Sequence, residues 1–425
     1  MNIGLLPRSH PRVHVRSRSL AARLQTVLTD GLREFPWPVI VSDWTGNTYT
    51  TGGTQAHWCG SPLEFHFKTE GAGQDAVALR GMSVLERFLA GELDIRGNLY
   101  VLTNLRDYFA IDLSAWRLLR ALSTTTLFQT VARARLNVRS HYDIPQAALE
   151  IYLDKRYMAY SCAMFEQPDR FDARELTTAG SGEGDTFDSL EKAQWRKFKD
   201  AVDFVNPRAG DTMLDVGCGY GGQLEVALAT HPFGKVVGCT HSSNQLAAGR
   251  ARMSRFPSSC WEITQSDYRE DHRVFDHVTS TGMACHVGPR GLVPYVRNIR
   301  ARIKRGGRYV HHVLMTPYIR KPLDAEVGAA FNKKYVWPGF HWFTMGDHVK
   351  ALEQNGFEIQ RAVNLAPHYA KTAAAWYERM MARADESRRL LGSQTFRAWQ
   401  IYLGGGSGSV QSRKSHVYRM YCVAV

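Results

Sequence analysis

The stretch MLDVGCGYGG, residues 213–222, passes from apolar residues through an acid into four glycines spread over six positions. Its apolar start predicts a buried strand, and the segment QLEVALA that follows it predicts a helix. Glycines between a strand and a helix permit a tight turn and let a ligand approach the main-chain N–H groups. The sequence therefore predicts a ligand-binding loop at the carboxyl end of a buried strand.

The residues around this loop bear on the kind of ligand. Gly217, Gly219 and Gly222 fit the G-x-G-x-x-G pattern of dinucleotide sites, which taken alone is a weak signal. Asp215 precedes the glycines, where a carboxylate can meet a positively charged or amine-bearing ligand. The next expected strand, KVVGCT (235–240), is not followed by the acid that binds ribose in nicotinamide enzymes. The loop therefore favours a cationic or amine-bearing ligand over a dinucleotide.

From residue 211 onward, strand-like and helix-like segments alternate. We expect strands over 212–217, 235–240, 275–282, 308–315 and 357–365, and helices over 244–256, 292–303 and 347–354. Such alternation predicts an α/β fold with a doubly wound, mostly parallel sheet. Upstream, strand-like pieces (37–44, 63–69) mix with helix-like ones (82–93, 97–109). We therefore divide the chain into a smaller N-terminal α+β domain (1–120), a helical connecting region (121–205) and the large domain (206–425).

Composition restricts the partners. The 425 residues carry 53 Lys and Arg against 40 Asp and Glu, a net charge of +13. This balance favours an anionic partner, either nucleic acid or a membrane surface. The first 29 residues contain no acid and predict a basic arm, with arginines at Arg8, Arg12, Arg16, Arg18 and Arg23. No apolar run reaches the length of about 20 residues that a spanning helix needs.

The seven cysteines are odd in number and show no metal-ligand spacing. They indicate free thiols in a reducing compartment, and we expect no metal site.

Further motifs follow one another in order over residues 125–425. They are SHYDIP, MAYSCAMF, SLEKAQ, VVGCTHSSNQ, SDYRE, GMACHVGP, YVHHVLM, YVWPGF and HYAKTAAAWYERM. Together with LDVGCGYGG, they resemble the cyclopropane-fatty-acyl-phospholipid synthases and their mycolic-acid and other C-methyltransferase relatives. The resemblance implies a Rossmann-like class I methyltransferase that uses S-adenosylmethionine. It also implies methyl or methylene transfer to the cis double bond of unsaturated phospholipid acyl chains, through a carbocation.

The resemblance implies a set of cofactor contacts. They are Tyr160, Ser161, Asp215, Gly217, Gly219, Thr240, Gln245 and Tyr268. Thr240 and Gln245 would serve the ribose and adenine side, and Tyr268 would lie against adenine. The alternative for Tyr268 is an ordinary buried aromatic residue.

A second set is implied for a bound bicarbonate that acts as the base. Its members are Cys162, His312, the main chain of Leu314, and Tyr369. His311 and His312 occupy opposite faces of the expected strand, and the motif favours His312. The alternatives are that Cys162 is a small buried apolar residue and that Tyr369 only packs.

One position departs from the family. Where relatives carry G-M-F-E-H-V-G, residues 282–288 read GMACHVG, so that Cys285 replaces a glutamate. A thiol is a weaker hydrogen-bond acceptor than a carboxylate and is shorter. We therefore hypothesise that bicarbonate is held more weakly or is shifted, and that the product is a methyl or methylene branch instead of a ring. Cys285 is better explained as a spacer than as a nucleophile.

The resemblance also predicts how the substrate arrives. We expect a cytoplasmic, bacterial protein that attaches peripherally to an anionic membrane surface, with no nucleic-acid partner. The N-terminal domain would contact lipid or mediate homodimer formation. The expected helix 373–391 lines the entrance of an acyl tunnel or touches lipid, or it is an ordinary packed helix. IYLGGGSGSV (401–410) opens no recognisable helix, and we expect it to pack tightly near the tunnel.

Two other functions stay open at this point. One is a small-molecule N-methyltransferase, because plant alkaloid enzymes share this fold and several of the motifs. The other is a catalytically silent lipid-binding paralogue that has lost its glutamate.

Overall fold

The computed structural model describes residues 19–109, 144–178, 187–317 and 326–425. Arg8, Arg12, Arg16, Arg18, most of the SHYDIP motif and most of the glycine-rich segment 179–187 lie outside the described residues. Two sheets, one of seven strands and one of four, organise the described part of the chain.

The larger sheet confirms the predicted fold class. Its strand order is β10-β11-β9-β8-β5-β6-β7. The strands are β5 (Thr212–Val216), β6 (Lys235–Thr240), β7 (Trp261–Gln265), β8 (His277–Thr281), β9 (Arg308–Met315), β10 (Phe357–Asn364) and β11 (His416–Ala424). Six strands run in the same direction, whereas β11 is antiparallel to its neighbours β9 and β10. The strand order reverses between β5 and β8, which is where open α/β sheets bind ligands.

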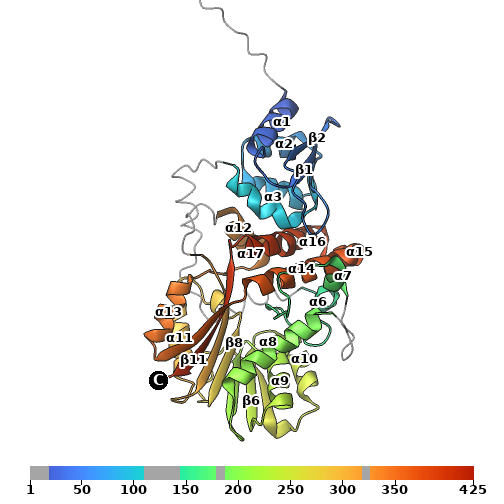
Figure 1. Ribbon diagram of the computed structural model, residues 1–425. Coiled ribbons are helices and arrows are strands. Elements are labelled where there is room, and N and C mark those ends of the chain that lie inside the picture. Colours follow the sequence, from blue (N-terminus) through green and yellow to red (C-terminus); the bar gives the residue numbers. More distant parts are fainter. Residues whose placement is uncertain (1–18, 110–143, 179–186, 318–325) are drawn as a thin grey trace, which may run out of the picture.

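Helices cover both faces of this sheet. Figure 1 shows α8, α9 and α10 on one side and α11 and α13 on the other. Their bounds are α8 (Leu190–Val205), α9 (Gly222–Thr230), α10 (Ser243–Met253), α11 (Leu292–Arg300) and α13 (Met345–Glu353), with short 3-10 turns η2 (Ser258–Cys260) and η3 (Ala284–His286). Because the sheet is buried between these two layers of helices, both faces of its central strands carry apolar side chains.

The N-terminal unit is a four-stranded sheet in the order β2-β1-β3-β4 with three α-helices. Its elements are α1 (Leu20–Gly31), β1 (Pro38–Ser42), β2 (Thr48–Gly52), β3 (Leu63–Phe67), α2 (Glu70–Val77), α3 (Gly81–Leu89), β4 (Leu93–Gly97) and the 3-10 helix η1 (Leu99–Asp107). The expected strands 37–44 and 63–69 correspond to β1 and β3.

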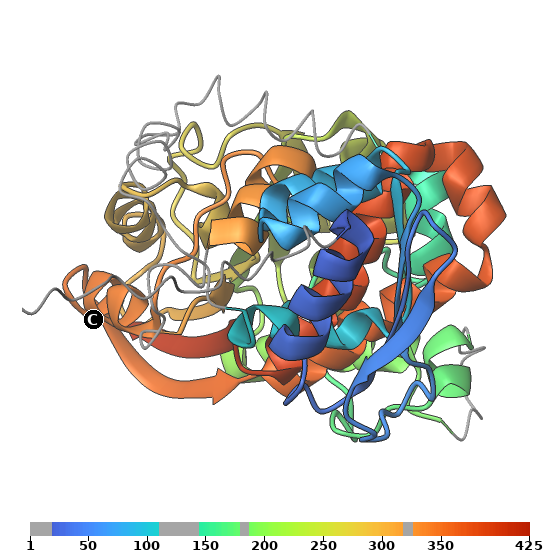
Figure 2. The same ribbon diagram turned by 90° about the horizontal axis from the view of Figure 1, so that it is seen from above.

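The last helices of the chain lie between the two sheets. They are α14 (Ala366–Ala382), α15 (Ala384–Leu391), α16 (Ser393–Gln400), the π-helix η6 (Ile401–Gly405) and α17 (Gly406–Gln411). Figures 1 and 2 show the N-terminal unit seated on this layer. The remaining helices α6 (Gln146–Tyr152), α7 (Ala173–Thr177), α12 (Glu326–Phe331) and the π-helix η5 (Asn332–Val336) surround it.

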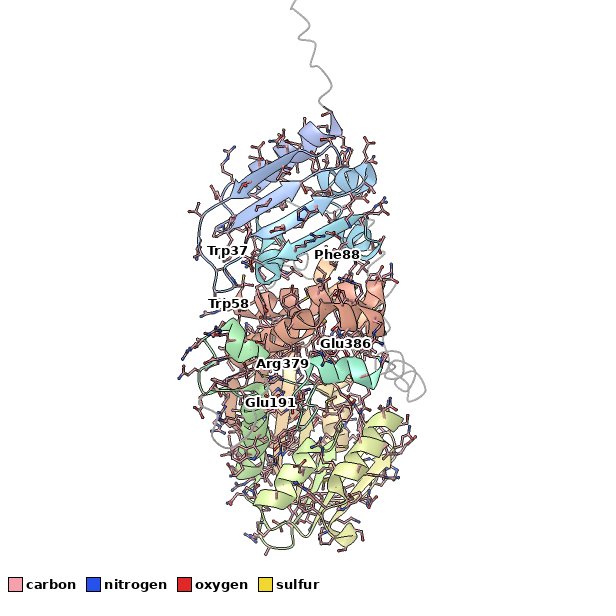
Figure 3. All side chains as sticks on the ribbon, turned by 90° about the vertical axis from the view of Figure 1, so that its right-hand side faces the viewer. Trp37, Trp58, Phe88, Glu191, Arg379 and Glu386 are labelled. Atoms are coloured by element: carbon pink, nitrogen blue, oxygen red, sulfur yellow. The ribbon has the colours of Figure 1, made fainter. Side chains whose placement is uncertain are left out.

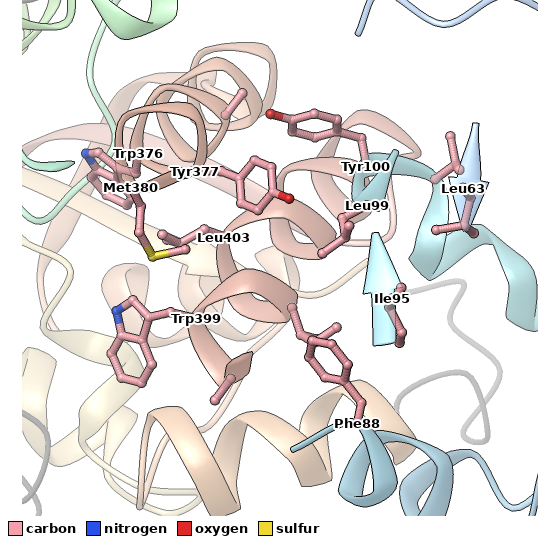
Figure 4. Packing of buried hydrophobic residues seen from close by; sticks show 14 of the residues in the cluster. Leu63, Phe88, Ile95, Leu99, Tyr100, Trp376, Tyr377, Met380, Trp399 and Leu403 are labelled. Carbon is pink, nitrogen blue, oxygen red and sulfur yellow. The ribbon is translucent and has the colours of Figure 1, made fainter. Parts of the chain in front are cut away.

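One hydrophobic core joins the two ends of the chain. Leu99 and Tyr100 of the N-terminal unit pack in one cluster with Tyr377, Trp399 and Leu403 of the last helices (Figure 4). The Tyr100 hydroxyl also donates to a carboxylate oxygen of α14, at 2.6 Å. The N-terminal unit is therefore packed against the helices that follow the sixth strand of the large sheet.

The expectation that 401–410 opens no helix is wrong. The segment is helical throughout η6 and α17. A Cβ at Gly408 would lie 1.6 Å from the carbonyl oxygen of Tyr100, so that tight packing requires glycine there. Packing therefore overrides the low helix propensity of glycine.

Two smaller expectations also need correction. The spacing of Asp188 and Glu191 predicts a capping-box start with Asp188 before the helix. The N-cap of α8 is instead Ser189, whose side chain accepts from the main-chain N–H of Lys192. The expected helix 373–391 is interrupted at Arg383, where α14 gives way to α15.

Candidate active site

The glycine loop lies at the carboxyl end of β5, beside the reversal of strand order. Gly217 (φ +78°), Gly219 (φ +54°) and Gly221 (φ +78°) adopt the left-handed backbone that favours glycine, and α9 begins at Gly222. A Cβ at Gly219 would meet nothing within 4 Å and would project beside a large cavity that Gly219 lines. A Cβ at Gly222 would lie 2.7 Å from the ring of Phe198 on α8. The loop therefore leaves open space on one side and packs a helix on the other.

A cavity of about 1360 Å³ starts at this loop and extends to the N-terminal unit. Twelve of the thirteen predicted site residues line it. They are Tyr160, Ser161, Cys162, Gly217, Gly219, Thr240, Gln245, Tyr268, Cys285, His312, Leu314 and Tyr369. Its far end is lined by apolar side chains of the N-terminal unit, among them Leu28, Phe65, Leu85 and Ile95. The fold thus brings residues from distant motifs together around one cavity.

Asp215 is the predicted site residue that does not line the cavity. It lies beneath the loop, 3% exposed, and the Thr279 hydroxyl of β8 donates to its Oδ1 at 2.8 Å. Burial raises the pKa of the Asp215 carboxyl to about 7. A cationic group placed over the loop would stabilise the ionised form of this carboxylate.

The segment that carries Tyr160, Ser161 and Cys162 is held by buried polar groups. The carboxylate of Asp154 accepts from the main-chain N–H groups of Tyr157 (2.6 Å) and Ala159 (2.8 Å). The side-chain amide of Gln194 on α8 donates to the main-chain oxygen of Ser161 at 3.0 Å. These bonds hold an irregular segment, in which Met158 has a positive φ (+52°), against the cavity.

Thr240, at the end of β6, contacts Gln245 in the first turn of α10. The Thr240 hydroxyl donates to Oε1 of Gln245 at 2.7 Å. Nearby, Tyr268 packs edge-on against Tyr295 with ring centroids 5.3 Å apart. Asp267, which also lines the cavity, is held by Arg269 and His241 and was not singled out from the sequence.

The opposite wall carries the second predicted set. The Cys162 thiol donates to the main-chain oxygen of Ala163 at 3.2 Å, and the Cys285 thiol donates to that of Gly282 at 3.0 Å. Burial raises the pKa of both thiols to about 12. Both side chains are therefore neutral, and neither is a reactive thiolate at neutral pH.

The two histidines of YVHHVLM separate as expected for a strand. His312 lines the cavity. His311 lies in a hydrogen-bonded chain with Tyr309 (2.8 Å) and His348 (3.0 Å), which come from β9 itself and from α13.

Aromatic rings form much of the remaining wall. Tyr160 lies 5.5 Å from Trp337 and 5.2 Å from Trp376, measured between ring centroids. His286 packs edge-on against Trp337 and Phe340, and burial lowers its pKa to about 4. The wall is therefore neutral and rich in π faces.

Two buried cations behind the wall were missed in the sequence analysis. Lys197 donates from Nζ to the Ser161 hydroxyl at 2.8 Å, and Arg419 donates to His312. Burial lowers the pKa of the Lys197 ammonium. The burial of Lys197 could have been predicted from its spacing of four residues from Ala193 and Ala201, which lie on the buried face of α8. The burial of Arg419 could have been predicted from the apolar residues around it in the final strand.

Helix α14, the first part of the expected helix 373–391, packs against α8 through Arg379. Arg379 is 5% exposed, and its guanidinium forms a two-bond ion pair with Glu191 of α8 at 2.9 and 3.0 Å (Figure 3). Trp376 of the same helix lines the cavity. No helix among the described residues is long and apolar enough to cross a membrane.

Known proteins resemble this chain in sequence and in structure. A protein of Pseudomonas putida described as a probable fatty acid methyltransferase is 31% identical over 270 residues, which is 62% of this chain and 63% of that protein. Sphingolipid C9-methyltransferase B of Emericella nidulans is 26% identical over 405 residues, which is 91% of this chain and 75% of that protein. Relatives thus occur in bacteria and in fungi, and the match spans less than two thirds of the Pseudomonas protein.

A solved mycolic acid cyclopropane synthase complexed with SAH has a TM-score of 0.60 to this chain at 22% identity, covering 68% of this chain and 98% of that one. This similarity confirms the class I methyltransferase fold. The family model described as mycolic acid cyclopropane synthetase matches residues 129–420. The chain belongs to the mycolic acid cyclopropane synthetase family.

Proposed function

We propose that this chain is an S-adenosylmethionine-dependent C-methyltransferase that acts on the cis double bond of unsaturated acyl chains in phospholipids. The observation that carries the proposal is the cavity, which joins the glycine loop to apolar side chains of the N-terminal unit. A long hydrocarbon chain fits such a continuous apolar space, whereas a small amine would fill only one end of it.

The residues at the loop fit S-adenosylmethionine. The open space beside Gly219 admits a ligand against the main chain, and buried Asp215 faces a cationic methionine portion from below. Thr240, Gln245 and Tyr268 line the side where the family places ribose and adenine. When bound, this group supplies an electrophilic methyl, and the electron pair of the broken carbon–sulfur bond stays on sulfur.

The remaining wall suits the chemistry of an alkene. The π electrons of the double bond form the new carbon–carbon bond, and positive charge develops on the neighbouring alkene carbon. The π faces of Tyr160, Trp337 and Trp376 stabilise such a charge, and apolar surroundings keep water from capturing it. Loss of a proton from the delivered methyl closes a ring, and loss from another carbon leaves a branch.

The donor set at the second wall fits a small oxyanion such as bicarbonate. Tyr369 and His312, which carry hydrogen-bonding side chains, line the cavity there together with Cys162 and Leu314. Cys285 lends no support, because its thiol is turned to the Gly282 carbonyl. We therefore propose that the oxyanion is weakly oriented and that branched products dominate.

Replacing Cys285 with glutamate tests this product assignment. We expect the cyclopropane fraction of the product to rise, because a carboxylate accepts a strong hydrogen bond from the oxyanion hydroxyl. The measurement is mass analysis of acyl chains after incubation with radiolabelled S-adenosylmethionine and vesicles of unsaturated phospholipid. C285S is the matched control and should leave the product ratio unchanged. A clean cyclopropane product from the unmodified chain would contradict the branching proposal.

Cofactor binding should depend on pH through Asp215. A carboxyl with a pKa of about 7 is about half ionised at pH 7 and only about one-tenth ionised at pH 6, so affinity should fall up to about fivefold between these two pH values. Binding at pH 6 should release a proton, because the cationic ligand favours the carboxylate. Calorimetry in buffers of different ionisation enthalpy measures both quantities. D215N should bind weakly without this pH dependence, whereas D211N, at the other end of β5, should behave as the unmodified chain.

The proposal extends to the membrane. The net charge of +13 supports peripheral attachment to anionic phospholipid, at about 1 kcal/mol for each basic residue near the surface. The N-terminal unit would hold lipid, since its apolar side chains line the cavity. Homodimer formation and a cytoplasmic location remain predictions.

The assay separates the alternatives. Label transferred to unsaturated but not saturated phospholipid supports the proposal, whereas label on soluble amines would identify an N-methyltransferase. Label on a sphingolipid alone would identify sphingolipids, and not phospholipids, as the substrate. Cofactor binding without any methyl transfer would identify a catalytically silent paralogue.

A further inference from the structure

Arg419 is a buried cation that touches the active site only through another residue. It lies on β11 directly opposite His312 of β9, so that the two side chains share one face of the sheet. Arg419 is 1% exposed and does not line the cavity. Its Nε and Nη2 both donate to Nδ1 of His312, at 3.3 and 3.2 Å.

This contact determines where His312 carries its proton. A guanidinium has donors only and is not deprotonated in proteins, so Nδ1 of His312 must be the acceptor. A neutral imidazole that accepts at Nδ1 carries its hydrogen on Nε2. Burial and the charge of Arg419 keep the pKa of His312 well below its ordinary value, so the ring is neutral. Because His312 lines the cavity, Nε2–H is the ring group left to face it.

Two cationic side chains, Lys197 and Arg419, lie behind this end of the cavity, and Arg419 is paired with the carboxylate of Asp200. Lys197 lies behind Ser161, and Arg419 is held in place by Asp200 (2.6 Å) and by the Lys197 main-chain oxygen (2.9 Å). The Cys162 and Cys285 thiols both point to main-chain oxygens. This end of the cavity therefore offers hydrogen-bond donors in a positive field.

We infer that Arg419 is a positioning residue that fixes His312 as an Nε2–H donor to a bound oxyanion and thereby prevents His312 from acting as the base. The inference rests on the proposed function. The proton lost by the substrate cation goes to an oxygen of that oxyanion, which becomes its conjugate acid. The electron pair of the broken C–H bond remains on the lipid and forms the ring or the double bond.

Two substitutions separate the hydrogen bond from the charge. R419Q keeps a neutral N–H donor for Nδ1, whereas R419M removes both the donor and the charge. R361Q is the matched control, since Arg361 also approaches Asp200, at 3.8 Å, and packs over Tyr421 without contacting His312. The bicarbonate requirement of each variant is measured in buffer depleted of carbon dioxide, with calorimetric binding of S-adenosylmethionine as the test of folding.

For R419M we expect the bicarbonate concentration at half-maximal turnover to rise about tenfold, the size of one hydrogen bond to a charged group. R419Q should show a smaller rise, R361Q none, and all three should bind S-adenosylmethionine as the unmodified chain does. The ¹⁵N spectrum of histidine-labelled protein, assigned by difference from H312Q, should show only the Nε2–H form of His312 in the unmodified chain and in R419Q. A mixture of the two tautomers should appear in R419M.

An Nδ1–H form of His312 in the unmodified chain would overturn the inference. It would also be overturned if R419M and R419Q needed no more bicarbonate than R361Q does. If R419M fails to bind S-adenosylmethionine, the bicarbonate requirements of R419Q and R361Q are compared instead, and equal values overturn the inference. Failure of the unmodified chain to methylate lipid at any bicarbonate concentration would overturn the proposed function instead. The histidine spectrum would then still show whether Arg419 fixes the tautomer.

Discussion

Replacing Gly219 with valine should abolish measurable binding of S-adenosylmethionine and reduce methyl transfer by at least about 100-fold, since a loss of about 3 kcal/mol of binding corresponds to that factor. Gly219 has φ +54° and lines the cavity, and a Cβ there would stand in the open space where the ligand must approach. A branched side chain therefore occupies the ligand's volume and also strains the loop. Calorimetric titration and the labelled-lipid assay measure the two losses.

Gly210 provides the matched control. It also has a positive φ (+90°) with nothing within 4 Å of an added Cβ, but it does not line the cavity. G210V should therefore show only the backbone strain, about 1–2 kcal/mol of stability, with unchanged cofactor affinity. Equal affinities for G219V and G210V would contradict the placement of the cofactor at this loop.

The sequence was most informative where elements are fully buried. KVVGCT and RYVHHVLM coincide in their bounds with β6 and β9, because central parallel strands are continuous apolar, β-branched runs. No strand was predicted for TYTTG, a polar segment that pairs with the preceding strand β1. None was predicted for the last strand either, since its partner β9 is distant in sequence. The glycine-rich helix 401–411 was missed because its local propensity opposes the state that packing selects.

The candidate site shows the same division. The motifs predicted twelve residues that line one cavity, since each motif marks a segment that must approach the ligand. The cations behind the wall could not be assigned in the same way. Lys197 and Arg419 look like solvated charges in the sequence, and only the fold shows that Ser161 and His312 are their partners.

The ion pair between Arg379 and Glu191 should give the largest change in stability among these substitutions. Arg379 is 5% exposed, and besides the two bonds to Glu191 it donates to the main-chain oxygens of Leu176 and Thr178. Leaving a buried carboxylate without its partner costs about 3–5 kcal/mol, so R379M should lower the free energy of unfolding by that amount. Urea denaturation followed by fluorescence measures the difference.

Two comparisons show whether the loss comes from the uncompensated charge. R388M removes an exposed partner of Asp385 and should cost no more than about 1 kcal/mol. The double variant R379M/E191M should recover part of the loss, since an apolar pair can replace a buried ion pair with little penalty. Because α14 also carries Trp376 and Tyr369, loosening this contact should move the cavity wall as well. R379M should therefore lose lipid methylation at temperatures where it still binds S-adenosylmethionine. If methylation and cofactor binding are lost at the same temperature, the ion pair stabilises the whole domain and not the cavity wall in particular.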